Sequence, residues 1–195
     1  MTKGSWPVGR QQGIRHDRGP VRRNVTLYLS GSVRRGLNDQ RLNAIAWDSE
    51  DESQIRAILS DMDITIHNPA STTIDRSDAL THFSADLSLI EASDFMITNG
   101  TASNGVGTGA EMMWAAMMDV PVITVAPRNS QYRRDEIELC GQRIQDWVHP
   151  FVFALSCMLA ESLEDALRAV RDCSRHDLIR MRPFIGESSI FHGGF

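Results

Sequence analysis

Four short apolar runs, each containing β-branched residues, recur along the chain with segments of helical spacing between most of them. The runs are residues 25–29, 63–67, 95–98 and 122–125. Runs of this length predict buried β-strands, and helical segments between strands predict crossover connections. Strands that alternate with helices form a mostly parallel sheet covered on both faces. We therefore predict a doubly wound, Rossmann-like α/β fold, with about five strands in one domain.

The length agrees with one domain. A chain of 195 residues holds one α/β domain with a sizeable core and is too short for two ordinary ones. We assign this domain to residues 24–175, after a basic N-terminal arm (1–23) and before a C-terminal tail (176–195). Helices are expected from Ser49 to about residue 60 and over 78–91, 108–118, 135–146 and 163–173. Residues 151–159 are apolar and fit either a strand or a helix.

The charge is spread unevenly. Residues 1–23 contain six Lys or Arg and one acid, Asp17, so the rest of the chain holds 14 of the 20 basic and 24 of the 25 acidic side chains. An acidic body argues against a nucleic-acid-binding surface on the folded part. The basic arm could contact nucleic acid, but we interpret it as a flexible terminus.

Cysteine usage and hydropathy favour a cytoplasmic protein. The three cysteines (Cys140, Cys157, Cys173) form no CxxC pair and leave an odd thiol, which suits a reducing compartment. The N-terminus lacks the apolar region of a signal peptide, and the longest uncharged apolar stretch, residues 151–160, is about half of a membrane span. No metal-ligand spacing, Walker loop, GxSxG or GxGxxG motif is present, so we expect no metal or cofactor.

The loop after the first strand reads Ser30-Gly31-Ser32-Val33-Arg34-Arg35-Gly36. Glycines let backbone N–H groups approach an anion, and hydroxyls and a guanidinium add charge-assisted bonds to a phosphate. The alternative is an ordinary strand-to-helix turn with solvated arginines.

The loop after the third strand leads into a helix through Gly105-Val106-Gly107-Thr108-Gly109-Ala110-Glu111. Free N–H groups there suit an anionic ligand, so Gly105, Gly107, Thr108 and Gly109 are candidate binding residues. We place Glu111 in the first helical turn, where the helix dipole favours an ionised carboxylate, as a nucleophile needs. The alternative is a plain N-terminal acid. The apolar residues 112–117 predict a largely buried helix and favour function.

Asp86 lies between Phe83 and Leu87 on the helix before the third strand. A second carboxylate near the first would let one attack while the other handles a proton. The alternative is a solvated charge on the helix face. Residues 147–150 (Trp-Val-His-Pro) could cover a pocket or form a subunit contact.

Three motifs together resemble the nucleoside 2-deoxyribosyltransferase superfamily, and most nearly its 2′-deoxynucleoside 5′-monophosphate N-glycosidase branch. They are residues 28–36, residues 86–94 and residues 107–111, and the similarity in their order and spacing covers about residues 25–125.

The resemblance implies a flavodoxin-like fold and a division of roles. A Glu at the position of Glu111 attacks the anomeric carbon, and an Asp at the position of Asp86 assists as an acid or positions the base. A Tyr at the position of Tyr28 lies under the sugar and disfavours a 2′-hydroxyl. The residues at the first turn bind the 5′-phosphate: Gly31, Ser32, Val33, Arg34 and Gly36. Members are usually dimers in which a neighbour contributes to the site.

The expected reaction is hydrolysis of the N-glycosidic bond of a nucleoside 5′-monophosphate, and Arg34 favours a phosphorylated substrate. Three alternatives stay open. The loop also fits the GxGTxxE pattern of cytokinin-activating phosphoribohydrolases. Base exchange by a transferase is a second alternative, although Gly105 stands where some transferases carry an aspartate. A non-catalytic nucleotide-sensing module is the third.

Overall fold

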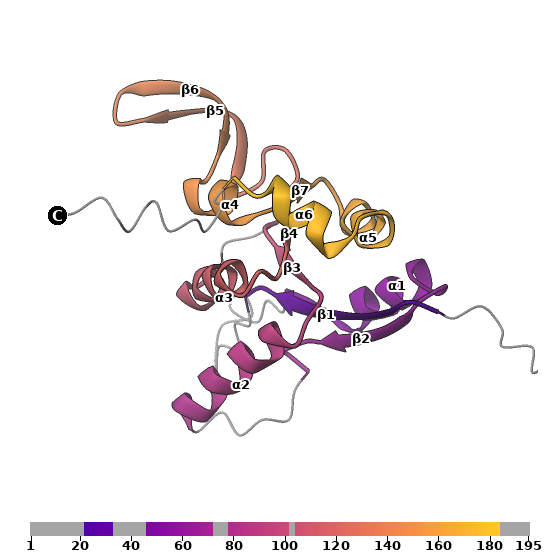
Figure 1. Cartoon of the computed structure of the whole chain (residues 1–195). Coiled ribbons are helices and arrows are strands. Elements are labelled where there is room, and N and C mark those ends of the chain that lie inside the picture. Colours follow the sequence, from indigo (N-terminus) through magenta and orange to yellow (C-terminus); the bar gives the residue numbers. More distant parts are fainter. Residues whose placement is uncertain (1–21, 33–45, 72–77, 102–103, 184–195) are drawn as a thin grey trace, which may run out of the picture.

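The computed structural model describes residues 22–32, 46–71, 78–101 and 104–183, and Figure 1 shows their arrangement. The elements in chain order are β1 (Asn24–Ser30), α1 (Ser49–Ile58), β2 (Asp63–His67), α2 (Ala79–Glu91), β3 (Phe95–Asn99), α3 (Val106–Met117), β4 (Val122–Val125), β5 (Arg133–Leu139), β6 (Gln142–Val148), α4 (Pro150–Leu155), β7 (Met158–Ala160), α5 (Leu163–Asp172) and α6 (Arg175–Met181).

The central sheet has five strands in the order β2-β1-β3-β4-β7, and every neighbouring pair is parallel. This is the flavodoxin-like strand order, so the predicted fold class is confirmed. The chain moves outward from β1 to β2 and then returns across β1 to β3. The carboxyl ends of β1 and β3 therefore form the switch point at which doubly wound sheets bind their ligands.

Alternation along the strands divides the core into two clusters. Leu27 and Leu29 of β1 face one side and pack with residues of α1, α5 and α6, whereas Tyr28 faces the other side and packs with residues of α2, α3 and α4. Successive side chains of a strand point to opposite faces, so this division follows from the backbone. The position of Tyr28 places its hydroxyl on the side of α3.

Side-chain caps begin α1 and α2. Asp48, one residue before the predicted Ser49, accepts hydrogen bonds from the N–H groups of Glu50 and Asp51, and the side chain of Asp51 accepts one from the backbone N–H of Asp48. Asp78 caps α2 in a similar way by accepting from Leu80 and Thr81.

The buried faces of α2 and α3 are narrow. Leu80 and Phe83 of α2 are exposed, because the first turns of this helix project past the carboxyl edge of the sheet (Figure 1). On α3, Met112 and Ala115 are buried, but Met113 and Met117 are exposed. The prediction of a largely buried α3 is therefore wrong.

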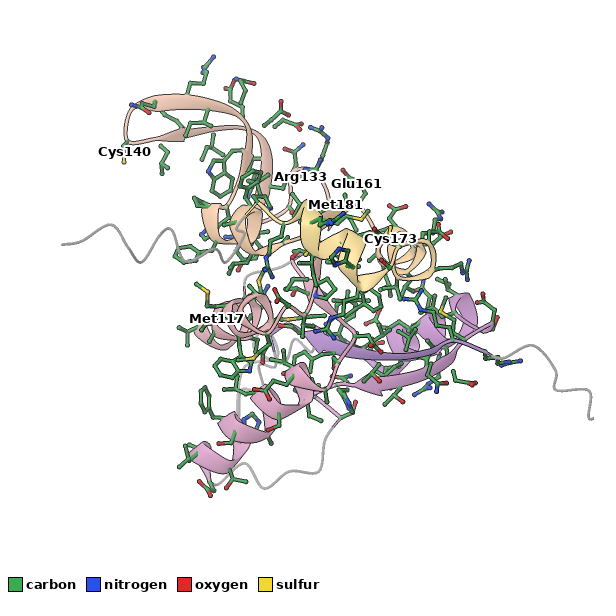
Figure 2. The ribbon with its side chains drawn as sticks, in the orientation of Figure 1. Met117, Arg133, Cys140, Glu161, Cys173 and Met181 are labelled. Carbon is green, nitrogen blue, oxygen red and sulfur yellow. The ribbon has the colours of Figure 1, made fainter. Side chains whose placement is uncertain are left out.

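The predicted helix over 135–146 is also wrong, because the chain forms an antiparallel hairpin there from β5 and β6. Cys140 and Gly141 form its tip with φ angles of 51° and 76°, values at which two-residue hairpin turns match the twist of the strands. Ile137 and Ile144 are cross-strand partners. The hairpin projects from the body, with Cys140 at its far end (Figure 2).

The base of the hairpin is fixed to the body. Arg133 forms an ion pair of 2.7 Å with Glu161, just after β7 (Figure 2). His149 packs edge-on against Tyr132 and Trp147, with ring centroids 5.6 and 5.9 Å away. The Trp147–Pro150 segment thus lies in an aromatic cluster at this base. The apolar stretch that follows contains both predicted alternatives, since α4 leads into β7.

The folded part continues past residue 175, where the sequence analysis placed the start of a tail. Ser174 and Asp177 form a capping box that begins α6, and Leu178 is fully buried against the α1 and α5 side of the core. A buried leucine on a capped helix accounts for the difference. Residues 1–21 and 184–195 lie outside the described part of the chain. Within that part, no helix is long and apolar enough to cross a membrane.

Candidate active site

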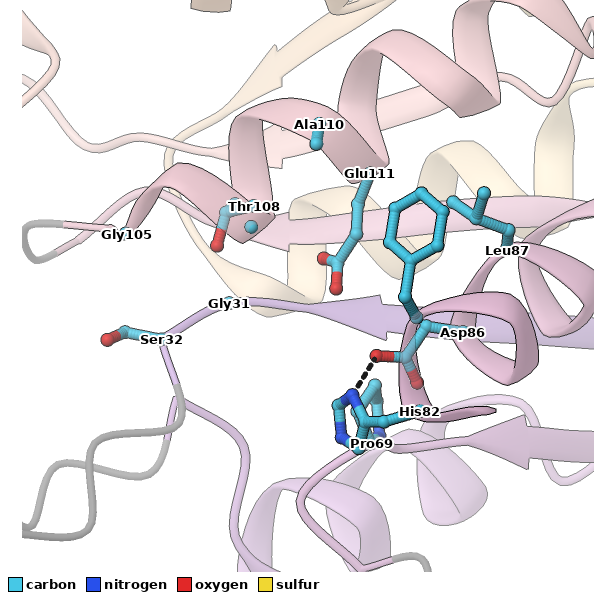
Figure 3. A pocket seen from close by; sticks show the side chains of 12 residues that line it. Gly31, Ser32, Pro69, His82, Asp86, Leu87, Gly105, Thr108, Ala110 and Glu111 are labelled. Atoms are coloured by element: carbon cyan, nitrogen blue, oxygen red, sulfur yellow. Dashed lines mark ion pairs between the residues drawn. The ribbon is translucent and has the colours of Figure 1, made fainter. Parts of the chain in front are cut away.

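A cavity of about 400 Å³ opens at the switch point, between the loop after β1 and the first turns of α2 and α3 (Figure 3). This volume is in the range of small-ligand sites. Seven predicted residues line the cavity: Gly31, Ser32, Asp86, Gly105, Gly107, Thr108 and Glu111. Three segments far apart in the sequence therefore meet where the topology favours a ligand.

Two other predicted residues that the structure describes, Tyr28 and Gly109, do not line it. Gly109 is exposed and is not among the lining residues; it is two positions, about 200° of helical rotation, from both Gly107 and Glu111. Val33, Arg34 and Gly36 lie outside the residues that the structure describes.

Glu111 is held by two hydroxyl groups of β1. Ser30 Oγ donates to Glu111 Oε2 over 2.5 Å, and the hydroxyl of Tyr28 donates to Oε1 over 3.1 Å. Both donors come from a rigid central strand, so the carboxyl group has a fixed orientation. Because α3 starts at Val106, Glu111 lies in the second turn and not in the predicted first turn.

The electrostatics of Glu111 differ from the expectation of an acid kept ionised by the helix dipole. Burial raises the pKa of Glu111 from its ordinary 4.5 to about 7. The hydrogen bonds from Ser30 and Tyr28 oppose this rise in pKa, and the nearby charge of Asp86 adds to it. A carboxyl group with a pKa near 7 changes its charge in the neutral range, as groups that take part in catalysis commonly do.

Tyr28 is a structural neighbour of both acids. Burial raises the pKa of Tyr28 well above its ordinary value, and the charges of Glu111 and Asp86 raise this pKa further. The phenol therefore stays protonated and acts as a donor toward Glu111. Its ring is fully buried among the residues of the α2 and α3 side.

Asp86 faces the same cavity from α2. The side chain is largely buried, and its Oδ2 lies 3.4 Å from Nδ1 of His82, one turn earlier on the helix (Figure 3). A largely buried carboxylate at a cavity is unlike the solvated surface charge that was the alternative for this residue.

Asn104 joins the two ligand-facing loops. Its Oδ1 accepts from the backbone N–H of Ser32 over 3.1 Å, and its Nδ2 donates to the carbonyl of Asn99 over 2.7 Å. The backbone N–H of Asn104 donates to the hydroxyl of Tyr132 over 2.7 Å. The loop that begins α3 is thus fixed both to the end of β1 and to the base of the hairpin.

The glycines of the two loops differ in their packing. A Cβ on Gly31 would collide with the Cβ of Ala46, so this glycine allows close approach within the protein. Within the described part of the chain, a Cβ on Gly105 or Gly107 would meet no atom within 4 Å beyond its chain neighbours and the backbone of its own helix. The described residues therefore leave space for a ligand beside these two glycines.

Sequence reasoning missed several residues of the site. Ser30 contacts Glu111, and the cavity lining also includes Pro69, His82, Phe83, Leu87 and Ala110. His82 could have been found, since it precedes Asp86 by four positions on a predicted helix and so shares its face. Pro69 had no comparable signal, because it comes from the loop after β2. Among the residues described, no group of three His, Cys, Asp or Glu side chains could hold a metal ion.

Comparison with known proteins gives a fold likeness. No protein-family model matches the chain, and no curated protein matches its sequence. A conserved protein from Enterococcus faecalis of solved structure is similar with a TM-score of 0.51 and 18% identity, covering 75% of this chain and 97% of that one. This likeness shows a shared fold.

Two further solved structures are similar at lower TM-scores. A 2-desoxiribosyltransferase from Leishmania mexicana has a TM-score of 0.47 at 14% identity, covering 76% of this chain and 98% of its own. A CMP N-glycosidase from Clostridium botulinum has a TM-score of 0.42 at 13% identity, covering 75% and 98%.

Proposed function

We propose that this protein is an enzyme that hydrolyses the N-glycosidic bond of a nucleoside 5′-monophosphate, with Glu111 as the nucleophile. The observation that carries the proposal is the position of Glu111. It is a partly buried carboxyl group fixed by Ser30 and Tyr28 at the switch point of the sheet, and it lines the same cavity as Asp86. Two carboxyl groups that share a cavity can divide nucleophilic and proton-transfer roles.

The first step forms a covalent glycosyl-enzyme. An oxygen of the ionised Glu111 bonds to the anomeric carbon while the carbon–nitrogen bond breaks, and the electron pair of that bond stays on the base. Asp86, in its protonated form, gives the departing nitrogen its proton. This step uses the arrangement in which Glu111 is ionised and Asp86 holds the proton.

The second step uses water. A water molecule attacks the anomeric carbon, the bond to Glu111 breaks with its electron pair on the carboxylate, and Asp86 takes the proton of the water. The enzyme returns to its starting state, and the products are the free base and the sugar 5-phosphate. This is the logic of retaining glycosidases.

The cavity has two chemically different ends that fit the two ends of a nucleotide (Figure 3). Ser32, Thr108 and the open space at Gly105 lie beside the first turn of α3, where backbone N–H groups favour a phosphate. Phe83 and Leu87 supply an apolar surface at the α2 side that suits a base. The sugar would then lie beside Glu111, and the resemblance at Tyr28 favours a 2′-deoxy substrate.

The test is to incubate the protein with a panel of ribo- and 2′-deoxynucleoside 5′-monophosphates and to measure the released base by chromatography. We expect release from at least one 2′-deoxynucleotide and less from the matching nucleoside, which lacks the phosphate. Glu111→Ala should abolish release and retain nucleotide binding by calorimetry.

Two outcomes would change the assignment. Tight nucleotide binding without release from any member of the panel would contradict the proposal and favour a sensing module. Formation of a new nucleoside when a second free base is added would favour base exchange over hydrolysis.

A further inference from the structure

His82 is a third titratable group in the cavity, and neither the nucleophilic nor the acid role uses it. It lies on α2 one turn before Asp86, with Nδ1 3.4 Å from Asp86 Oδ2. The His82 side chain retains 30% of its exposure and that of Asp86 retains 12%. Within the described part of the cavity lining, His82 is the one side chain that can carry a positive charge.

The first step of the proposed reaction leaves a negative charge on Asp86. When Asp86 gives its proton to the departing base, a carboxylate is left in a largely buried place beside a second carboxyl group. A new charge there is costly unless a donor or a cation faces it. The Nδ1 of His82, 3.4 Å from Asp86 Oδ2, is in position to supply either one.

We infer that His82 is a positioning residue for base departure: it orients the carboxyl group of Asp86 and stabilises the carboxylate that Asp86 becomes when it protonates the leaving base. The inference rests on the proposed function. The proton that reaches the base comes from Asp86, and Asp86 recovers one from the attacking water. His82 keeps its own Nδ1 proton throughout.

The first measurement is the effect of His82→Ala and His82→Asn on kcat and KM. Alanine removes the donor, so kcat should fall about tenfold or more while KM changes little. This fall is a part of the rate enhancement that a positioned general acid supplies. Asparagine places an amide N–H near the position of Nδ1 and should recover most of kcat. His176→Asn is the matched control, since His176 is exposed on α6, and it should behave as the wild type.

The second measurement uses substrates whose leaving base needs a proton to different degrees. A purine nucleotide methylated at N7 releases a neutral base without protonation, so His82→Ala should cleave it nearly as fast as the wild type does. If the wild type accepts only pyrimidines, a 5-fluorinated substrate, whose base leaves more easily, should shrink the defect in the same direction. Glu111→Ala should stay inactive on every substrate, because the nucleophile is needed in each case.

The outcomes separate this inference from the proposed function. Absence of base release by the wild type from any nucleotide overturns both. Suppose that the wild type releases base. If His82→Ala then loses kcat equally on ordinary and methylated substrates, or only raises KM, the role of His82 is overturned and hydrolysis stays in place. If circular dichroism shows that His82→Ala does not fold, His82→Asn carries the test. An equal loss of kcat by His82→Asn on both substrates would then overturn the role of His82.

Discussion

At the scale of single residues, the charge of Glu111 bears on the stability of the fold and on the proposed reaction. The sequence alone made this carboxylate a candidate, because the glycine-containing run 105–109 follows a predicted strand and leads into a predicted helix. It could not give the pKa, which depends on burial and on Ser30 and Tyr28, residues 81 and 83 positions away along the chain. The expected dipole effect acts in the opposite direction to the dominant cause, which is burial.

The raised pKa of Glu111 predicts a pH-dependent effect of Glu111→Gln on stability. The folded state holds the proton more tightly than the unfolded state, so this stabilisation is present below pH 4.5 and is lost as the pH rises through about 7. Gln mimics the neutral acid at every pH. Relative to the wild type, the variant should gain about 1–3 kcal/mol in unfolding free energy between pH 5 and pH 8.

Urea unfolding at both pH values measures this difference. Glu138→Gln, an exposed acid on the hairpin, serves as the control. A free-energy difference between variant and wild type that is the same at pH 5 and at pH 8 would show that burial does not raise the pKa of Glu111.

At the scale of elements, the sequence predicted the strands of the parallel sheet better than the β5–β6 hairpin and α6. Three of these strands, β1, β3 and β4, are apolar runs buried between two helix layers, and the edge strand β2 is an apolar run that is half-buried, so composition identifies all four. The hairpin of β5 and β6 was mistaken for a helix, because its strands are mostly polar and exposed on both faces. Its one signal was Gly141, whose positive φ favours a two-residue turn.

The helix α6 gives a test of where the folded unit ends. Leu178 is fully buried against the core. Leu178→Ala should therefore lower the unfolding free energy by about 2–5 kcal/mol, as for other buried leucines. Thermal or urea unfolding measures the loss.

The exposed neighbour Met181→Ala is the matched control, because Met181 is 57% exposed on the same helix. A change of less than about 0.5 kcal/mol in Leu178→Ala, the size of an ordinary surface substitution, would place α6 outside the cooperative unit.

At the scale of the whole molecule, two neighbouring helices, α2 and α3, carry exposed apolar side chains. Val106, Met113 and Met117 follow one side of α3 at helical spacing, and Leu80 and Phe83 project from the neighbouring α2. Large apolar patches on soluble proteins commonly mark association sites. We propose that a second copy of the chain covers the exposed apolar side chains of these two helices, and Phe83, which also lines the cavity, would then lie near the contact.

Light scattering tests this association. The wild type should have twice the 21.8 kDa mass of the chain, and Met117→Glu should shift the population to the single chain and raise KM, because the cavity loses its cover. Leu139→Glu places the same charge on an exposed leucine of the hairpin and should leave the mass unchanged. A wild type of single-chain mass would refute the proposal.

The division of the core by the sheet has a consequence for sequence divergence. Substitutions among the residues that pack α1, α5 and α6 change the support of the sheet, yet they reach the substrate only through the strands. Substitutions at Ile90 or Met112, which pack α2 and α3, shift the helices that carry Asp86 and Glu111 directly. Among homologues, core residues on the α1, α5 and α6 side should therefore vary more than those on the α2 and α3 side. Homologues that differ in substrate preference should differ mainly on the α2 and α3 side.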